Sequence, residues 1–316
     1  MSRPSVSILI PAFRPDWLDV AVASALAQTH ADFELLVSDD SAGNAIESVM
    51  AKWEDPRIRY FRNPRRGEPG ANRNLLIDEA RGEYLKFLFD DDFLLPRSVE
   101  LLLRAARETG AKLVFHARHL VDEVGRMLAS PRLVDPGATV VMPPSFLFEN
   151  LIAECANPIG EPTNILLDAA ALRAMALPFA LEGRRMRFLT DVALYTNFAA
   201  CGHTIAGIGY HGSAFRQHTA QTSGAQYVGY SAGYYEWELL RRWSVDAGHL
   251  APERFAAGNA KQISLYRQWA PQFPELDPFI ALAGATDDGR HLGPRFMEAL
   301  SLADLTIEMR RLAAVH

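Results

Sequence analysis

The chain has 316 residues, of which 49% are hydrophobic and 22% charged, a composition typical of a globular enzyme. Its formal net charge of −6 argues against general nucleic-acid binding, which needs a basic surface. The two cysteines are too few for a disulfide framework, and no apolar stretch approaches the roughly 20 residues of a membrane span. The apolar run near the amino terminus is too short for a signal sequence, and Pro11 interrupts it. We therefore expect a cytoplasmic protein whose contact with the inner membrane, where it has one, is peripheral and made through its substrate.

Short apolar runs alternate with helical patterns over the first 117 residues. Strands are expected at residues 6–10, 33–37, 57–61, 84–89 and 112–116. Helices are expected at residues 16–26, 46–53, 71–80 and 96–108. This alternation predicts a mostly parallel sheet flanked by helices, which is the α/β class.

The pattern changes beyond residue 117. A hairpin is expected at residues 119–133, helices at 145–153 and 190–200, and strands at 163–167 and 204–208. From residue 227 the pattern is mostly helical, with an apolar face formed by Trp237, Leu239, Leu240 and Trp243. We therefore divide the chain into three parts, residues 1–117, 118–225 and 226–316.

Carboxylates cluster where two predicted strands end, at Asp39-Asp40 and at Asp90-Asp91-Asp92. Ligands of open parallel sheets bind outside the carboxyl ends of the strands. A single aspartate there is more simply a helix cap or a solvated charge, but three in a row repel one another unless a cation such as Mg²⁺ or Mn²⁺ neutralises them. Neither G-x-x-x-x-G-K-[ST] nor G-x-G-x-x-G follows the first strand, which disfavours P-loop kinases and dinucleotide dehydrogenases. A nucleotide diphosphate would instead need a metal and an arginine, for which Arg73 is a candidate.

Four blocks of sequence resemble the family 2 glycosyltransferases of the GT-A fold, in order and in spacing. They are SILIPAF at 7–13, SALAQT at 24–29, FELLVSDDS at 33–41 and GEYLKFLFDDD at 82–92. The resemblance is strong over residues 5–110 and looser over 155–225. It implies a Rossmann-like, mostly parallel nucleotide-binding sheet in residues 1–117, an acceptor-binding part with the catalytic base in 118–225, and a helical extension in 226–316.

The resemblance places a nucleoside pocket at the end of the first strand. Pro11, Ala12 and Phe13 would line that pocket. Asp40 would accept a hydrogen bond from the base, typically uracil, whose imide is a donor that a carboxylate can meet. Arg73 lies where the family often has a residue near the base or the diphosphate, and a solvated helix arginine is the alternative.

The acid run corresponds to the D-x-D region that binds the ribose and a diphosphate-bridging metal. The resemblance makes Asp91 the principal ligand of Mn²⁺ or Mg²⁺ and Asp90 a ribose or supporting contact, and it leaves Asp92 unassigned. Many relatives read D-x-D-D, and Phe89 occupies the position of the first aspartate here. His218, in an R-x-H-x-x-Q-x-S pattern, is a candidate third metal ligand or diphosphate contact, with a hydrogen-bonded structural histidine as the alternative.

A catalytic base and an acceptor site are implied further along the chain. Asp191, in TDVALY, matches the acidic motif that opens a helix and carries the base, and a simple helix cap is the alternative. Glu161 and Thr163 match the loop below the acceptor site. The reaction implied is an inverting displacement in which Asp191 deprotonates an acceptor hydroxyl. The segment Arg184–Arg187 is open to three interpretations, a lid, an anionic-acceptor contact or a solvated basic loop.

Two rival functions stay open. A sugar-phosphate nucleotidyltransferase would need a glycine-rich, arginine-containing loop where residues 11–15 read PAFRP. A non-catalytic nucleotide-sugar or glycan-binding protein stays open because of Phe89. The favoured hypothesis is a transferase of polysaccharide biosynthesis that uses a nucleotide sugar, with UDP as the expected nucleotide. Its acceptor would be a glycan, a lipid-linked glycan, a protein or a small molecule. The C-terminal helices could pair two copies of the chain, cover the acceptor or approach a membrane.

Overall fold

The computed structural model describes residues 3–313, which form two compact units made of interleaved segments. Unit 1 comprises residues 3–142, 158–176 and 203–218, and unit 2 comprises 143–157, 177–202 and 219–313. The chain therefore passes between the units five times. The functional division at residues 117 and 225 is a separate matter and stays a prediction.

Unit 1 is built on one large sheet. Its strands are β1 (Val6–Ala12), β2 (Phe33–Asp39), β3 (Ile58–Arg62), β4 (Tyr84–Phe87), β5 (Phe93–Leu94), β6 (Leu113–Val121), β7 (Met127–Ala129), β8 (Thr139–Met142), β9 (Ile165–Asp168) and β12 (Ile205–Arg216). Among the described residues the order across the sheet is β3-β2-β1-β4-β9-β6-β12-β5, with β7 beside β6 and β8 beside β12.

The expected parallel sheet is confirmed for the strands that carry the acid clusters. β1 pairs in parallel with β2 and β4, and β2 pairs in parallel with β3. β9, predicted at residues 163–167, runs antiparallel between β4 and β6. Because β1, β2 and β4 point the same way, the residues that follow them collect at one edge of the sheet, where ligands of such folds bind.

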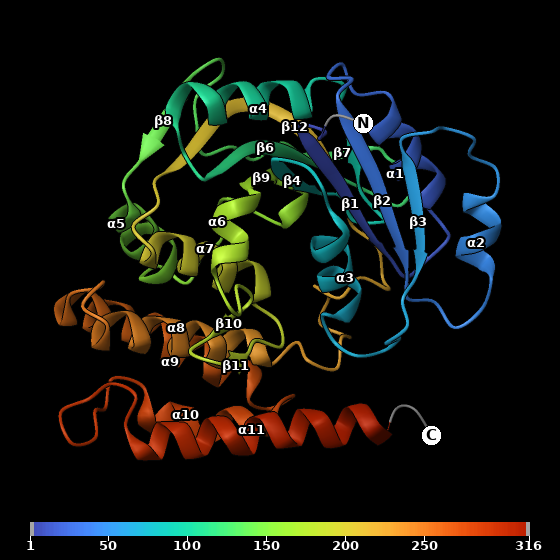
Figure 1. The fold of residues 1–316 in the computed structure, drawn as a ribbon. Helices are drawn as coiled ribbons and strands as arrows, with labels where there is room; N and C mark the ends of the chain where they lie inside the picture. Colours follow the sequence, from blue (N-terminus) through green and yellow to red (C-terminus); the bar gives the residue numbers. More distant parts are fainter. Residues whose placement is uncertain (1–2, 314–316) are drawn as a thin grey trace. The chain divides into compact units, whose positions relative to one another are not determined.

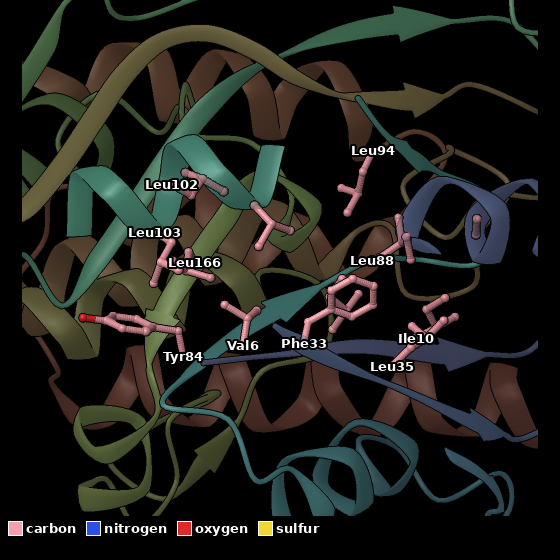
Figure 2. Close-up of a cluster of buried hydrophobic side chains, with 14 of the residues drawn as sticks. Val6, Ile10, Phe33, Leu35, Tyr84, Leu88, Leu94, Leu102, Leu103 and Leu166 are labelled. Carbon is pink, nitrogen blue, oxygen red and sulfur yellow. The ribbon is translucent and has the colours of Figure 1, made fainter. Parts of the chain in front are cut away.

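Helices α1 (Leu18–Leu26), α2 (Ala45–Met50) and α4 (Ser98–Thr109) bury one face of this sheet, and α3 (Ala71–Glu79) packs against β1 and β2. Figure 2 shows part of a buried cluster to which Val6, Phe33 and Leu35 contribute from the sheet and Leu102 and Leu103 from α4. A short helix α6 (Ala169–Ala174) and a 3₁₀ turn η2 (Pro162–Asn164) complete unit 1. Alternate residues of β1 and β2 thus fill an apolar core, and the predicted site residues follow the ends of these strands.

Unit 2 is mainly helical. Its elements are α5 (Pro144–Leu147), a π-helical turn η1 (Phe148–Ile152), the hairpin strands β10 (Ala180–Leu181) and β11 (Arg184–Arg185), α7 (Thr190–Ala200), α8 (Ala232–Asp246), α9 (Pro252–Trp269), η3 (Pro274–Leu276), α10 (Asp277–Leu282) and α11 (Pro294–Ala313). α8 packs against α9, α11 and η1. None of the helices described between residues 3 and 313 is long and apolar enough to cross a bilayer.

The apolar face predicted for α8 is only part of what this helix buries. Leu239, Leu240 and Trp243 are buried, whereas Trp237 is only half-buried. The buried side of α8 also contains four charged residues that the sequence pattern did not predict. Each is at most 2% exposed: Glu236, Glu238, Arg241 and Arg242. Hydrophobic periodicity cannot identify a buried side whose charges are neutralised by partners elsewhere in the chain.

Helix α11 is apolar on two sides. Phe296, Leu300 and Ile307 are buried, and a separate row consisting of Leu302, Leu305, Met309 and Leu312 is 56–63% exposed. Self-association through the C-terminal helices stays a prediction.

Candidate functional site at the strand edge

The loop after β1 is held by the first aspartate of the acid run. Asp90 Oδ2 accepts hydrogen bonds from the backbone N–H groups of Phe13 (2.6 Å) and Arg14 (2.7 Å). Burial raises the pKa of Asp90 to about 6, although these backbone donors oppose the rise. Phe13 is 57% exposed, and the Arg14 guanidinium lies 5.7 Å from its ring centroid. Asp90 thus supports an exposed aromatic ring, an arrangement suited to stacking on a nucleobase.

The acid pair after β2 divides into a structural and an outer carboxylate. Asp39 is fully buried and accepts hydrogen bonds from Tyr60 Oη (2.8 Å) and the Ser41 N–H (2.7 Å). Asp40 is half-buried, and its Oδ1 accepts a hydrogen bond from Asn63 Nδ2 at 2.6 Å. Its backbone N–H donates to the Ala12 carbonyl at 2.9 Å, so Asp40 and the end of β1 are brought together as expected.

Arg73 lies in the first turns of α3, close to the same edge. The helix follows Gly70, whose φ of 81° is a left-handed conformation that favours glycine. A Cβ at Gly70 would lie 3.1 Å from Arg73 Nη2, so the guanidinium packs against this glycine. Asn72, next to Arg73, donates from Nδ2 to the Ala12 carbonyl at 3.2 Å. α3 is therefore tied to the loop after β1.

Asp91 and His218 are in direct contact, although 127 positions separate them. The Asp91 Oδ2–His218 Nε2 distance is 3.0 Å, with the Asp91 side chain 17% exposed and that of His218 2%. Arg216 Nε donates to the Asp91 carbonyl at 2.9 Å, and the Trp17 ring lies 4.7 Å from the His218 ring. The end of β12 therefore holds both the backbone and the side chain of Asp91.

Carboxylate and imidazole are suitable donors for a divalent cation such as Mn²⁺. No group of three or more His, Cys, Asp or Glu side chains that could hold a metal occurs within residues 3–313. A cation at Asp91 and His218 would therefore need further oxygens from its ligand, as Mg²⁺ does when it binds through one or two carboxylates and substrate phosphates. The pair fits a metal that arrives with a diphosphate.

Asp92 faces inward. It is fully buried, and it accepts hydrogen bonds from Thr163 Oγ1 (2.7 Å) and the Arg216 N–H (3.0 Å). Burial raises the pKa of Asp92 well above its usual value. Lys86 is also fully buried, donates to the Thr163 carbonyl, and has its pKa lowered by burial to about 7. Asp92 thus links the end of β4 to η2 and β12.

The two residues expected at the acceptor site are engaged within unit 1. Thr163 is fully buried on Asp92. Glu161 forms an ion pair with Arg118 at 3.2 Å, and both side chains are less than 20% exposed. Their acceptor contacts stay predictions, and the role that their observed contacts support is to shape the loop.

Asp191 lies in the first turn of α7 in unit 2, and α7 spans the residues predicted for it. Asn157 Nδ2 donates to Asp191 Oδ2 at 2.8 Å. The N-cap position belongs to Leu189, so the helix-cap alternative for Asp191 receives no support. In the preceding segment, Arg184 and Arg187 both bind Asp304 of α11. These ion pairs with Asp304 neutralise part of the arginine charge within unit 2.

Several residues of this arrangement were not singled out by the sequence. Trp17, Asn63 and Lys86 in unit 1, and Asn157 and Glu236 in unit 2, contact the predicted residues or their loops. The lysine inside the apolar run LKFLF is the one signal that was visible, because a charged residue in a buried strand needs a partner.

An α/β fold with a mostly parallel sheet, an exposed aromatic ring and a carboxylate–imidazole pair at the strand edge has the architecture of a GT-A glycosyltransferase. The chain belongs to glycosyl transferase family 2, whose model matches residues 7–172. The Staphylococcus aureus protein TarS, residues 1–349, aligns with a TM-score of 0.61 over 96% of this chain and 83% of that one, at 15% identity. The same protein in complex with UDP-GlcNAc aligns with a TM-score of 0.58, at 14% identity over 98% of this chain and 92% of that one. These likenesses establish the fold.

Curated relatives share parts of their length with the chain. The GalNAc(5)-diNAcBac-PP-undecaprenol beta-1,3-glucosyltransferase of Campylobacter jejuni is 37% identical over 33% of this chain and 35% of its own length. The Escherichia coli UDP-Glc:alpha-D-GlcNAc-diphosphoundecaprenol beta-1,3-glucosyltransferase WfgD is 25% identical over 55% and 64%. The succinoglycan biosynthesis protein ExoO of Rhizobium meliloti is 28% identical over 63% and 57%. The chain thus spans less than two thirds of each of these relatives.

Proposed function

We propose that the protein is a metal-dependent, inverting glycosyltransferase that moves a sugar from a UDP-sugar to a hydroxyl group. The observation that carries this proposal is the contact between Asp91 and His218 at the edge that also holds Ala12, Phe13 and Asp40. In this proposal Phe13 at that edge stacks on the base, Asp40 accepts the uracil imide, and Asp91 and His218 are the metal donors. A dinucleotide or P-loop site would need a glycine-rich phosphate loop after the first strand, where residues 11–15 read PAFRP.

In the proposed reaction, five residues have specific roles. Phe13 and Asp40 bind the base, and Asp91 and His218 would hold Mn²⁺ or Mg²⁺. The cation supplies Lewis-acid stabilisation of the negative charge on the diphosphate. Asp191 accepts the proton of the acceptor hydroxyl while that oxygen bonds to the anomeric carbon. The bond from this carbon to the diphosphate oxygen breaks, and UDP departs with the electron pair.

The first substrates to test come from the relatives. Two of them are named for β-1,3-glucosyl transfer to diphosphoundecaprenol-linked glycans. We therefore propose a lipid-linked or polysaccharide acceptor and UDP-glucose or UDP-GlcNAc as donors. Such an acceptor would bring the protein to a membrane surface through its substrate.

The experiment is a panel of UDP-sugars with Mn²⁺, with and without EDTA, in which released UDP is measured in the presence of glycan acceptors. UDP release that needs Mn²⁺ and rises with acceptor supports transfer. Pyrophosphate release from UTP and a sugar phosphate would instead indicate a nucleotidyltransferase. Binding of UDP-sugars without turnover, across the full acceptor panel, would indicate a non-catalytic binding protein.

A further inference from the structure

The backbone immediately before α7 presents three N–H groups to one carboxylate. Helix N-termini leave such groups without intrahelical acceptors. The N-cap residue Leu189 forms no side-chain cap hydrogen bond. Glu236 of α8 instead binds the segment that leads into the helix, because its two carboxylate oxygens accept from the backbone N–H groups of Arg187, Phe188 (3.0 Å) and Leu189 (2.7 Å).

The position of Glu236 is itself well defined. Glu236 is 2% exposed and lies in the first turns of α8, which packs against three other elements of unit 2. Within residues 3–313, no Lys or Arg forms an ion pair with its carboxylate, so backbone amides at the start of a helix are the groups that compensate its charge. A second anchor acts on the same segment, since the Arg187 side chain binds Asp304 and Glu308 of α11.

Asp191 lies two residues after Leu189, which carries the last of these amides. Its carboxylate is fixed from one side by Asn157 and carried from the other by the first turn of α7. A rotation of residues 187–189 would therefore move the carboxylate as well. Displacements of about 1 Å in a reacting group are enough to cost about 100-fold in rate.

We propose that Glu236 is a positioning residue for the catalytic base, and that it sets the orientation of Asp191 by holding the three amides before α7. The inference rests on the proposed function, because it takes Asp191 to be the base. It also assigns a task to the C-terminal helical region, which lies outside the residues 7–172 that match the family model. A stabilising role alone would not require the contact to precede Asp191.

The matched control is Glu238, two residues along the same helix. It is fully buried like Glu236, but its carboxylate binds Arg242 (2.6 Å) and Tyr266 and does not contact residues 187–189. Glu236→Gln and Glu238→Gln are thus the same isosteric change in equally buried sites. In Glu236→Gln the new NH₂ group faces backbone donors, so at least one of the three amides loses its acceptor.

The test measures UDP release from UDP-glucose or UDP-GlcNAc with Mn²⁺ and the acceptor found active, together with hydrogen exchange of residues 187–191. We expect Glu236→Gln to lower kcat about 10- to 100-fold, to leave the donor KM within about two-fold, and to speed exchange at Arg187–Leu189. Glu238→Gln should keep kcat within about three-fold and leave that exchange unchanged. In an Asp191→Asn background, Glu236→Gln should add less than about two-fold, because the two residues act as one unit.

Equal kcat losses in Glu236→Gln and Glu238→Gln, unchanged exchange at residues 187–189, or fully multiplicative losses with Asp191→Asn would each overturn the proposal. If Glu236→Gln does not fold, Glu236→Asp keeps the charge but cannot reach all three amides, and the same outcomes apply to it. Full activity in Asp191→Asn would remove the proposed base, whereas the exchange measurement would still report whether Glu236 holds this segment. The two failures are therefore distinguishable.

Discussion

In each unit a partly exposed carboxylate, Asp91 or Asp191, is supported by a buried carboxylate. The two units differ in how far the supporting residue lies along the chain from the segment that it holds. In unit 1, Asp91 is followed directly by the buried Asp92, which holds Arg216 and through it the tail of β12. In unit 2, the amides before Asp191 are held by Glu236, which is 47 positions beyond Leu189. A local support appears inside a sequence motif, whereas a remote support depends on tertiary structure.

The largest effect is expected where the two carboxylates themselves are changed. Asp91→Ala and Asp191→Asn should each lower kcat by about 10²- to 10⁴-fold, since one removes the proposed metal donor and the other the proposed base. Isothermal titration with UDP should separate them. Mn²⁺-dependent UDP binding should be lost in Asp91→Ala and kept in Asp191→Asn. If both variants lost it, the division of labour between the units would be wrong.

A smaller effect is expected from the support in unit 1. Asp92→Asn should lower kcat about 10- to 100-fold and weaken Mn²⁺ binding in the presence of UDP, because the hydrogen bond that Asp92 accepts from the Arg216 N–H, two residues before His218, would lose its charged acceptor. Thr163→Val, which removes one donor to Asp92 and preserves shape, should act in the same direction and less strongly. Unchanged Mn²⁺ affinity in both variants would show that Asp92 serves stability alone.

The sequence predicted the elements that carry these groups better than it predicted the contacts between them. α7 was expected at residues 190–200 and occupies them, and the acid run follows a buried strand as expected. β4 ends at Phe87, earlier than expected, because a turn closes when the Asp92 N–H donates to the Phe89 carbonyl. β12 continues to Arg216 because β6 offers it a partner as far as Val121.

The roles of Thr163 and Glu236 show what the sequence could not reveal. Thr163 belongs to a segment that resembles the family's loop below the acceptor site, yet nothing in that pattern indicates that its hydroxyl is buried on Asp92. Glu236 occurs in a helical pattern where glutamate is usually solvated. Its carboxylate is identified only when the amides of residues 187–189 are seen beside it. Polar contacts between residues far apart in the chain produce no periodic pattern in the sequence.

The support in unit 2 should be visible in the pH dependence of stability. Burial raises the pKa of Glu236 from an ordinary value of 4.5 to about 7. Between those values the folded state binds more protons than the unfolded state, so this group makes stability fall as pH rises from about 4.5 to about 7. In chemical denaturation, Glu236→Gln should reduce that fall by on the order of 1–3 kcal/mol relative to wild type. An identical pH slope in both proteins would contradict the buried, titrating carboxylate.

The smallest effect is expected at Asp90, which supports the proposed nucleoside platform at Phe13. In Asp90→Asn the amide oxygen can take the place of Oδ2 and accept from both Phe13 and Arg14, but the two hydrogen bonds lose their charged acceptor, which costs about 1 kcal/mol. UDP affinity should therefore weaken about five-fold with kcat nearly unchanged. Glu34→Gln is the matched control. Glu34 also accepts a backbone N–H, from Arg81, but it lies at the start of β2, whereas Asp40 follows the end of that strand. An equal loss of UDP affinity in Glu34→Gln and Asp90→Asn would mean that the weakening reflects general loosening of the sheet. A loss in Asp90→Asn alone would mean that Asp90 holds the Phe13 platform in its binding position.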